Sequence, residues 1–262
     1  MVRDLCSRAV EAYDRPVVTV GLITVLGGIL RLFHLGFKPL WFDEAVIYWI
    51  SNSGSVANII TANVSGNSAP PLFAILVSLM LNIGHSEPVL RLIPFLGGVA
   101  TIPAVYFLSR QFLQRTPAYF SALAVAIAPT QVQYSQQLRE YSLTVLTASI
   151  MLALFCKQIR RPTWANWALM VVVMGLGIFL QYGLALLVAA LDLIWVALLW
   201  SPRSGRRLRL ISWGSAQIVL LCIVVAVYCL SLKEQMKVGF GTGPRSGSVS
   251  YTHLTLPTIY SV

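Results

Sequence analysis

Two adjacent carboxylates, Asp43 and Glu44, follow the first long apolar segment of a chain that has only 9 acidic residues. A carboxylate beside hydrocarbon is costly unless water or a partner group stabilises it, so the pair is a candidate functional site. Such a group can take the proton of a hydroxyl while the hydroxyl oxygen attacks an electrophile. We therefore predict Asp43 as a general base and Glu44 as a second acid or an orienting group. The alternative is that the pair caps a helix that begins near Glu44, because the helix dipole favours acids there.

A second polar group, formed by Arg139, Glu140 and Tyr141, follows a glutamine-rich stretch at residues 131–137. The planar fork of an arginine suits a phosphate group, so Arg139 is a candidate phosphate contact. Glu140 and Tyr141 are predicted to belong to the same substrate-binding group. The alternative is an arginine at the membrane interface that is paired with Glu140.

Three further residues interrupt apolar segments. Arg91 is a second candidate phosphate contact, with pairing to Glu87 as the alternative. Tyr182 is either a lining residue of the site or part of a turn between two apolar segments. Arg31 lies near the end of the first apolar segment, where we expect its charged end to extend toward the interface.

The composition is that of an integral membrane protein. Hydrophobic residues make up 57% of the chain and charged residues 11%, whereas a soluble domain carries about a quarter charged residues. The net charge is +10, and the basic residues cluster in short loops between apolar segments. That pattern is typical of topology determinants and of contact with anionic lipid headgroups. It argues against a nucleic-acid partner.

Eight apolar segments are visible. The first, at residues 16–35, is long enough to cross a bilayer. The others lie at 70–84, 88–109, 117–131, 141–156, 164–181, 183–200 and 210–231.

The basic loops decide how these segments are oriented. If all eight crossed the membrane with the N-terminus inside, the loops at 110–116, 157–163 and 201–209 would lie outside, against the positive-inside rule. Segment 70–84 begins with two prolines and is short for a span, so we interpret it as an interfacial or re-entrant helix. This gives an all-α, polytopic protein of about seven transmembrane helices with outer juxtamembrane helices.

This topology places two polar segments on the outer face of a cytoplasmic membrane, at residues 36–87 and about 130–140. Asp43 and Glu44 lie in the first, and Arg139 lies in the second. The two segments could converge into one site.

The predicted membrane module covers residues 1–238. Residues 239–262 are rich in Gly, Ser and Thr and predict an irregular tail. From about residue 244 the tail resembles a translated sequencing adapter, so we treat that part as non-native.

An enzyme on the outer face cannot draw on cytosolic nucleotide sugars, so an activated sugar would arrive on a lipid phosphate. A carboxylate base, a positive group for the departing phosphate and an apolar groove are the parts that sugar transfer needs. A single base without a covalent intermediate inverts the configuration.

The ordered set of motifs resembles the membrane glycosyltransferases of the protein O-mannosyltransferase and aminoarabinose transferase type, the GT-C class. The motifs are Leu40-Trp41-Phe42-Asp43-Glu44-Ala45, Ala69-Pro70-Pro71-Leu72-Phe73, Arg91 with Gly97-Gly98, and Tyr134-Ser135-Gln136-Gln137-Leu138-Arg139-Glu140-Tyr141-Ser142.

The resemblance implies an N-terminal seven-span module with Asp43 as base, a polyprenyl-phosphate sugar donor, and a protein, lipid or glycan acceptor. No cofactor is implied with certainty, and a divalent metal is compatible with the family. Two departures stand out. Relatives often have His or Lys before the Pro-Pro pair, where this chain has Ser68-Ala69. They also often have an Asp in the second motif, where this chain has Gln136, Gln137, Arg139 and Glu140.

The absence of later spans leads us to expect a fragment of a longer enzyme. Two other functions fit the composition, a transporter or flippase of lipid-linked saccharides and a non-catalytic assembly subunit. Polar groups near the outer interface favour the enzyme, because a transporter would place them near the middle of the membrane.

Overall fold

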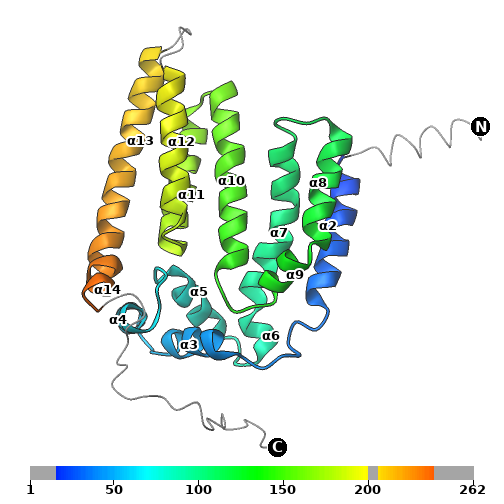
Figure 1. Ribbon diagram of the computed structural model, residues 1–262, viewed down its shortest axis with the longest axis vertical. Coiled ribbons are helices and arrows are strands. Elements are labelled where there is room, and N and C mark those ends of the chain that lie inside the picture. Colours follow the sequence, from blue (N-terminus) through cyan, green and yellow to red (C-terminus); the bar gives the residue numbers. More distant parts are fainter. Residues whose placement is uncertain (1–15, 200–205, 239–262) are drawn as a thin grey trace, which may run out of the picture.

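The computed structural model describes residues 16–199 and 206–238, and within these ranges the chain is helical with no strand. Seven longer helices run side by side between two ends (Figure 1). They are α2 (Pro16–Leu32), α7 (Leu92–Ser109), α8 (Arg115–Ile127), α10 (Tyr141–Arg160), α11 (Trp164–Leu180), α12 (Leu184–Leu199) and α13 (Arg206–Val227). The predicted tail at 239–262 lies outside the described residues.

The shorter elements gather at the lower end of the bundle (Figure 1). They are α3 (Phe42–Ser51), α4 (Val56–Gly66), α5 (Leu72–Leu81), α6 (Glu87–Leu90), α9 (Pro129–Ser135), the π-helix η1 (Tyr228–Leu232) and α14 (Lys233–Val238). Segment 70–84 thus forms α5, a helix of 10 residues beside α3 and α4. At 1.5 Å per residue, α5 is about 15 Å long and too short for the ~30 Å core of a bilayer.

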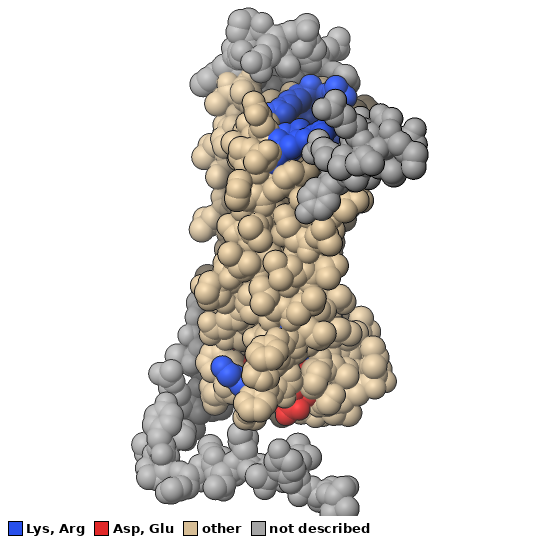
Figure 2. Space-filling model, turned by 90° about the vertical axis from the view of Figure 1, so that its right-hand side faces the viewer, with Lys and Arg blue, Asp and Glu red and all other residues tan. Residues whose placement is uncertain are grey.

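Three described helices are long and apolar enough to cross a membrane by length and composition: Leu92–Ser109, Tyr141–Arg160 and Trp213–Lys237. The helices Pro16–Leu32, Trp164–Leu180 and Leu184–Leu198 are apolar but shorter. Figure 2 shows a broad band without charged side chains on one face, with basic side chains gathered above it. The count of seven spans stays a prediction.

The bundle has two main apolar cores. One joins α10, α11, α12 and α13 around Met170 and Trp195, and the other joins α2, α7 and α8 around Ile102 and Ala122. A third cluster contains Ile47 of α3, together with Phe73, Val77, Leu90, Leu138 and Leu180. This third cluster fixes the short helices on the bundle, so they form a packed layer.

Arg31 holds the lower ends of three helices together. Its side chain is fully buried and donates to the carbonyls of Val125 and Ala126, in the last turn of α8, at 2.9 and 2.8 Å. Its Nε also donates to Ser135 Oγ of α9. Gly98 makes room for this contact, because a Cβ there would lie 1.8 Å from Ser135 Oγ. The expectation that Arg31 extends toward the interface is wrong, since the free carbonyls at the end of α8 need a donor.

The two ends of the bundle can be told apart by cysteine labelling. In a variant without the four native cysteines, Thr61→Cys in α4 and Thr116→Cys in α8 place exposed thiols at the lower and upper ends. We expect an impermeant maleimide to label the thiol at 61 nearly completely in intact cells, and the thiol at 116 only after permeabilisation, because the positive-inside rule predicts that the basic loops face inside. Labelling of 116 alone in intact cells would reverse the orientation.

Candidate functional site

Glu44 belongs to the first turn of α3. Trp41 is the N-cap residue, with extended backbone, and Glu44 stands three positions later. The backbone N–H of Trp41 donates to Glu44 Oε2 at 3.3 Å. This is the reciprocal half of a capping box, so Glu44 does cap the helix, as the alternative to a functional pair anticipated.

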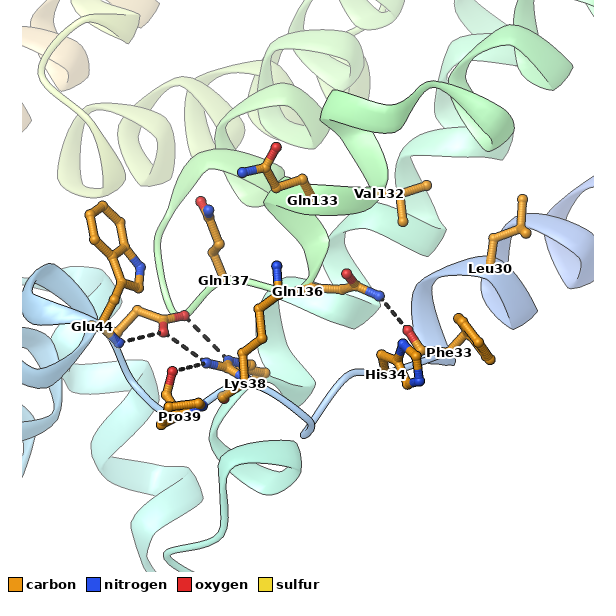
Figure 3. Close-up of a pocket in the computed structure, with 12 residues that line it drawn as sticks. Leu30, Phe33, His34, Lys38, Pro39, Glu44, Val132, Gln133, Gln136 and Gln137 are labelled. Atoms are coloured by element: carbon orange, nitrogen blue, oxygen red, sulfur yellow. Dashed lines mark hydrogen bonds and ion pairs between the residues drawn. The ribbon is translucent and has the colours of Figure 1, made fainter. Parts of the chain in front are cut away.

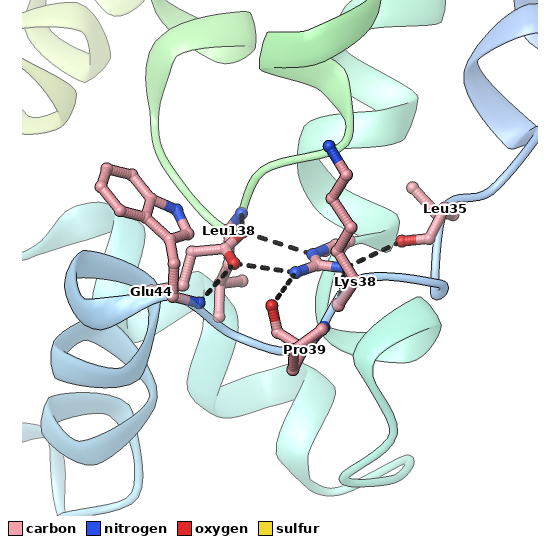
Figure 4. Close-up of polar contacts among 7 residues, drawn as sticks. Leu35, Lys38, Pro39, Glu44 and Leu138 are labelled. Atoms are coloured by element: carbon pink, nitrogen blue, oxygen red, sulfur yellow. Dashed lines mark hydrogen bonds and ion pairs between the residues drawn. The ribbon is translucent and has the colours of Figure 1, made fainter. Parts of the chain in front are cut away.

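The main partner of Glu44 is Arg91, which lies between α6 and α7. Glu44 Oε2 and Arg91 Nη2 are 2.8 Å apart, and the two side chains are 1% and 3% exposed. Glu44 Oε1 also accepts the backbone N–H of Leu138, from the second polar segment (Figure 4). The carboxylate therefore joins the two polar segments. Arg91 makes this ion pair with Glu44, and its link to Glu87 is a backbone hydrogen bond only.

The remaining donors of Arg91 bind the loop that enters α3. Its Nη atoms donate to the carbonyls of Leu35, Lys38 and Pro39 at 3.0, 2.8 and 3.4 Å. With the two bonds to Glu44, all five N–H groups of the guanidinium are used. Arg91 is thus a structural anchor with no donor left for a substrate.

The Asp43 side chain has a different environment from that of Glu44. This side chain is half-buried and has no hydrogen bond or ion pair with the residues that the structure describes. Its charge acts on Glu140, which places the two predicted site carboxylates in one electrostatic environment. Asp43 is therefore available for chemistry, whereas Glu44 is engaged.

Arg139, Glu140 and Tyr141 form one cluster. Arg139 Nη2 lies 3.5 Å from Glu140 Oε1, and the guanidinium carbon lies 5.4 Å from the centre of the Tyr141 ring. Arg139 Nε and Glu140 Oε2 are buried without a hydrogen-bond partner among the described residues. The predicted pair between Arg139 and Glu140 is present, and each side chain keeps one unused polar atom.

Burial raises the pKa of the Glu140 carboxyl above its ordinary value. The positive charge of Arg139 opposes this shift, and the negative charge of Asp43 adds to it. Glu140 therefore keeps its proton to a higher pH in the folded protein than in the unfolded chain.

Tyr182 lies at a separate polar junction. Its hydroxyl lies 3.0 Å from Ser231 Oγ and donates to Gln235 Oε1 at 2.9 Å. Gln235 Nε2 in turn donates to the carbonyls of Asn67 and Ala69, before the Pro-Pro pair. Tyr182 thus connects η1 and α14 to the loop before α5. Its predicted role in substrate binding stays a prediction.

A cavity of about 580 Å³ opens beside the Glu44–Arg91 pair (Figure 3). Its size is within the ~300–1,000 Å³ of small-molecule sites. Besides Glu44 and Arg91 it is lined by Leu30, Phe33, His34, Lys38, Pro39, Trp41, Val132, Gln133, Gln136 and Gln137. Reasoning from the sequence missed Lys38. The sequence did offer one signal for it, because Lys38 is the sole Lys or Arg of the polar segment 36–87.

His34 directs the chain from α2 into this cavity. Its φ is 62°, in the left-handed region that non-glycine residues seldom adopt. It follows the last turn of α2, where a left-handed residue commonly ends a helix. The His34 ring lies between Phe33 and Phe37, with centroids 4.0 and 4.9 Å away. The turn therefore brings the loop that carries Lys38 under α9.

Among the described residues, no group of three or more His, Cys, Asp or Glu side chains is placed to hold a metal ion. Dependence on a divalent metal stays a prediction that comes from the resemblance.

The sequence pattern of the dolichyl-phosphate-mannose-protein mannosyltransferase family matches residues 68–230, which is more than half of the chain. The chain belongs to this family. Among curated individual proteins, none matches the chain. The mannosyltransferase family indicates a glycosyltransferase-type activity with polyprenyl-phosphate sugar donors. Together with the apolar helices, it indicates a membrane protein.

The part that matches the mannosyltransferase family includes Arg91 and the Arg139 cluster, and it begins after Asp43 and Glu44. The two parts are joined by the contacts of Glu44 with Arg91 and with the Leu138 N–H. These contacts hold the first turn of α3, which also carries the predicted base Asp43, against the family region.

Breaking the buried ion pair should destabilise the protein. Arg91→Met leaves the Glu44 charge buried and unpaired, at a cost of about 3–5 kcal/mol. In a double-mutant cycle with Glu44→Gln, we expect a coupling free energy of about 2–3 kcal/mol. The free energy of unfolding in detergent measures both. Additive effects of the two changes would show that the pair does not stabilise the fold.

The raised pKa of Glu140 predicts a pH dependence of stability. The unfolded carboxyl loses its proton near 4.5, whereas the folded one keeps it to higher pH. Stability contributed by the protonated form is therefore lost as pH rises from about 4.5 through the raised pKa. Thermal unfolding of wild type and Glu140→Gln should show wild type losing more stability over this window. Parallel pH profiles would contradict the shift.

Proposed function

We propose that this protein transfers a sugar from a polyprenyl phosphate to an acceptor hydroxyl on the outer side of the membrane, with inversion. Asp43 acts as the general base. The acceptor oxygen forms a bond to the anomeric carbon, the bond from that carbon to the phosphate oxygen breaks, and the phosphate leaves with the electron pair. The acceptor proton goes to the Asp43 carboxylate.

The observation that carries this proposal is the different bonding of the two adjacent acids. Glu44 is buried and satisfied by Arg91, Leu138 N–H and Trp41 N–H. Asp43 is half-buried and unpartnered within the described chain. A general base needs a free carboxylate near the acceptor. The glycosyltransferase-type activity that the family indicates is a chemistry for which such a base is useful.

The Arg139 cluster is the second part of the proposed site. Arg139 Nε and Glu140 Oε2 are buried polar atoms without partners in the described chain, and such atoms are costly unless a ligand or water satisfies them. We assign Arg139 to the donor side and Glu140 to hydrogen bonding with a sugar or acceptor hydroxyl. Tyr141 stacks against the guanidinium and limits its movement.

Replacement of the base tests the function. In vesicles that contain a polyprenyl-phosphate mannosyl donor and membrane extract as acceptor, we expect Asp43→Asn to lower sugar transfer by about 100-fold or more. Glu87→Gln removes another carboxylate from the same outer segment and should retain activity. The measurement is label transferred from the lipid to the acceptor fraction.

Undiminished transfer by a folded Asp43→Asn protein would remove Asp43 as the base. Movement of the labelled carrier between leaflets by the wild-type protein, with no transfer of sugar, would favour the flippase instead.

A further inference from the structure

Of the two arginines that the sequence suggests as phosphate contacts, Arg91 has no N–H group left for a phosphate. Arg91 is 3% exposed, and each of its five N–H groups already has an acceptor in Glu44 or in the carbonyls of Leu35, Lys38 and Pro39. A phosphate could bind Arg91 only by displacing these acceptors. Those bonds hold the loop before α3, so such an exchange would disorder the site it serves.

Lys38 has the opposite properties. Arg91 donates a hydrogen bond to the backbone carbonyl of Lys38, which fixes the position of Lys38 in the loop. The Lys38 side chain is exposed and lines the cavity. Figure 3 shows the Lys38 side chain rising from the loop toward Gln136 and Gln137. No partner of its ammonium group is found in the described part of the chain. Lys38 is therefore a positioned cation with its charge unused.

The charge balance of the cavity favours an anion. Its lining contains one carboxylate, Glu44, and that group is neutralised by Arg91 at 2.8 Å. Lys38 is left as the uncompensated charge. The side-chain amides of Gln133 and Gln137 add hydrogen-bond donors on the opposite wall. A phosphate group matches this combination of a point charge and neutral donors.

The apolar part of the cavity continues into a stripe on α2. Leu30, Phe33 and Val132 line the cavity. On the helix, exposed apolar side chains repeat at spacings of three and four residues, at Leu22, Val25, Ile29 and Leu32. Residues at these spacings share one helix face. An isoprenoid tail can lie along this face within the bilayer while its phosphate enters the cavity.

We infer that the cavity between the end of α2, the loop at 33–41 and α9 binds the phosphate of a prenyl phosphate, with Lys38 as its charge contact. This inference rests on the proposed function, because it assigns the donor-phosphate subsite of that reaction. When the glycosidic bond breaks, the Lys38 ammonium offsets the negative charge that develops on the leaving phosphate. Arg91 serves as a positioning residue that holds Lys38 and Glu44.

Binding of farnesyl phosphate to the detergent-solubilised full chain tests the assignment. We expect Lys38→Gln to weaken binding by about 10-fold, the loss of one charged hydrogen bond. Lys38→Arg should bind within about threefold of wild type because it restores the charge. Lys157→Gln removes an exposed lysine at the other end of the bundle and should change nothing. Farnesol, which lacks the phosphate, should bind wild type and Lys38→Gln equally.

Wild-type affinity of Lys38→Gln for farnesyl phosphate would overturn the inference. Displacement of farnesyl phosphate by an equal concentration of phosphatidic acid would overturn it too, because the cavity would then be a general headgroup site. Asp43→Asn separates this inference from the proposed function. It should bind farnesyl phosphate like wild type and fail only in transfer. Lys38-dependent binding without any sugar transfer by wild type would uphold the subsite and contradict the proposed function.

Discussion

The buried ion pair between Glu44 and Arg91 is the interaction on which the lower end of the molecule depends. Burying two charges is unfavourable unless their hydrogen-bonding capacity is satisfied. Here the guanidinium uses all five donors, and the carboxylate accepts the N–H groups of Trp41 and Leu138 as well. The pair therefore fixes the loop before α3, the start of α7 and the loop before α10 relative to one another. Every residue of the proposed site lies on or beside these three segments, except Tyr182.

Helix geometry explains why two neighbouring acids have different environments. Successive residues of an α-helix point about 100° apart, so Asp43 and Glu44 in the first turn of α3 cannot face the same surroundings. Glu44 points into the packed layer and stabilises it. Asp43 is left half-buried and unpartnered in the described chain. A similar division separates Arg91 from Lys38, since the arginine holds the loop and the lysine on that loop keeps a free charge.

The apolar clusters show how a layer of short helices can carry polar chemistry beside a membrane. Ile47, Phe73 and Leu138 are fully or almost fully buried in one cluster, which joins α3 and α5 to the segment before α10. Arg31 donates to the carbonyls at the end of α8. These carbonyls would otherwise be buried without a hydrogen-bond donor, which is unfavourable. The layer therefore has a core and satisfied helix ends of its own, and the cavity forms at its edge.

Composition and spacing were enough to predict a helical membrane protein, a short helix within residues 70–84 and the two polar segments, because apolar runs in a bilayer must form helices and the positive-inside rule orients the loops. The family motifs also lie within single segments. Tertiary structure alone decided that Arg91 pairs with Glu44, 47 residues away, instead of with Glu87, and that Leu138 N–H, 94 residues away, completes the contact. It also buried Arg31 and left Lys38 free. Such contacts follow no sequence spacing, since they depend on which helix ends meet when the bundle packs.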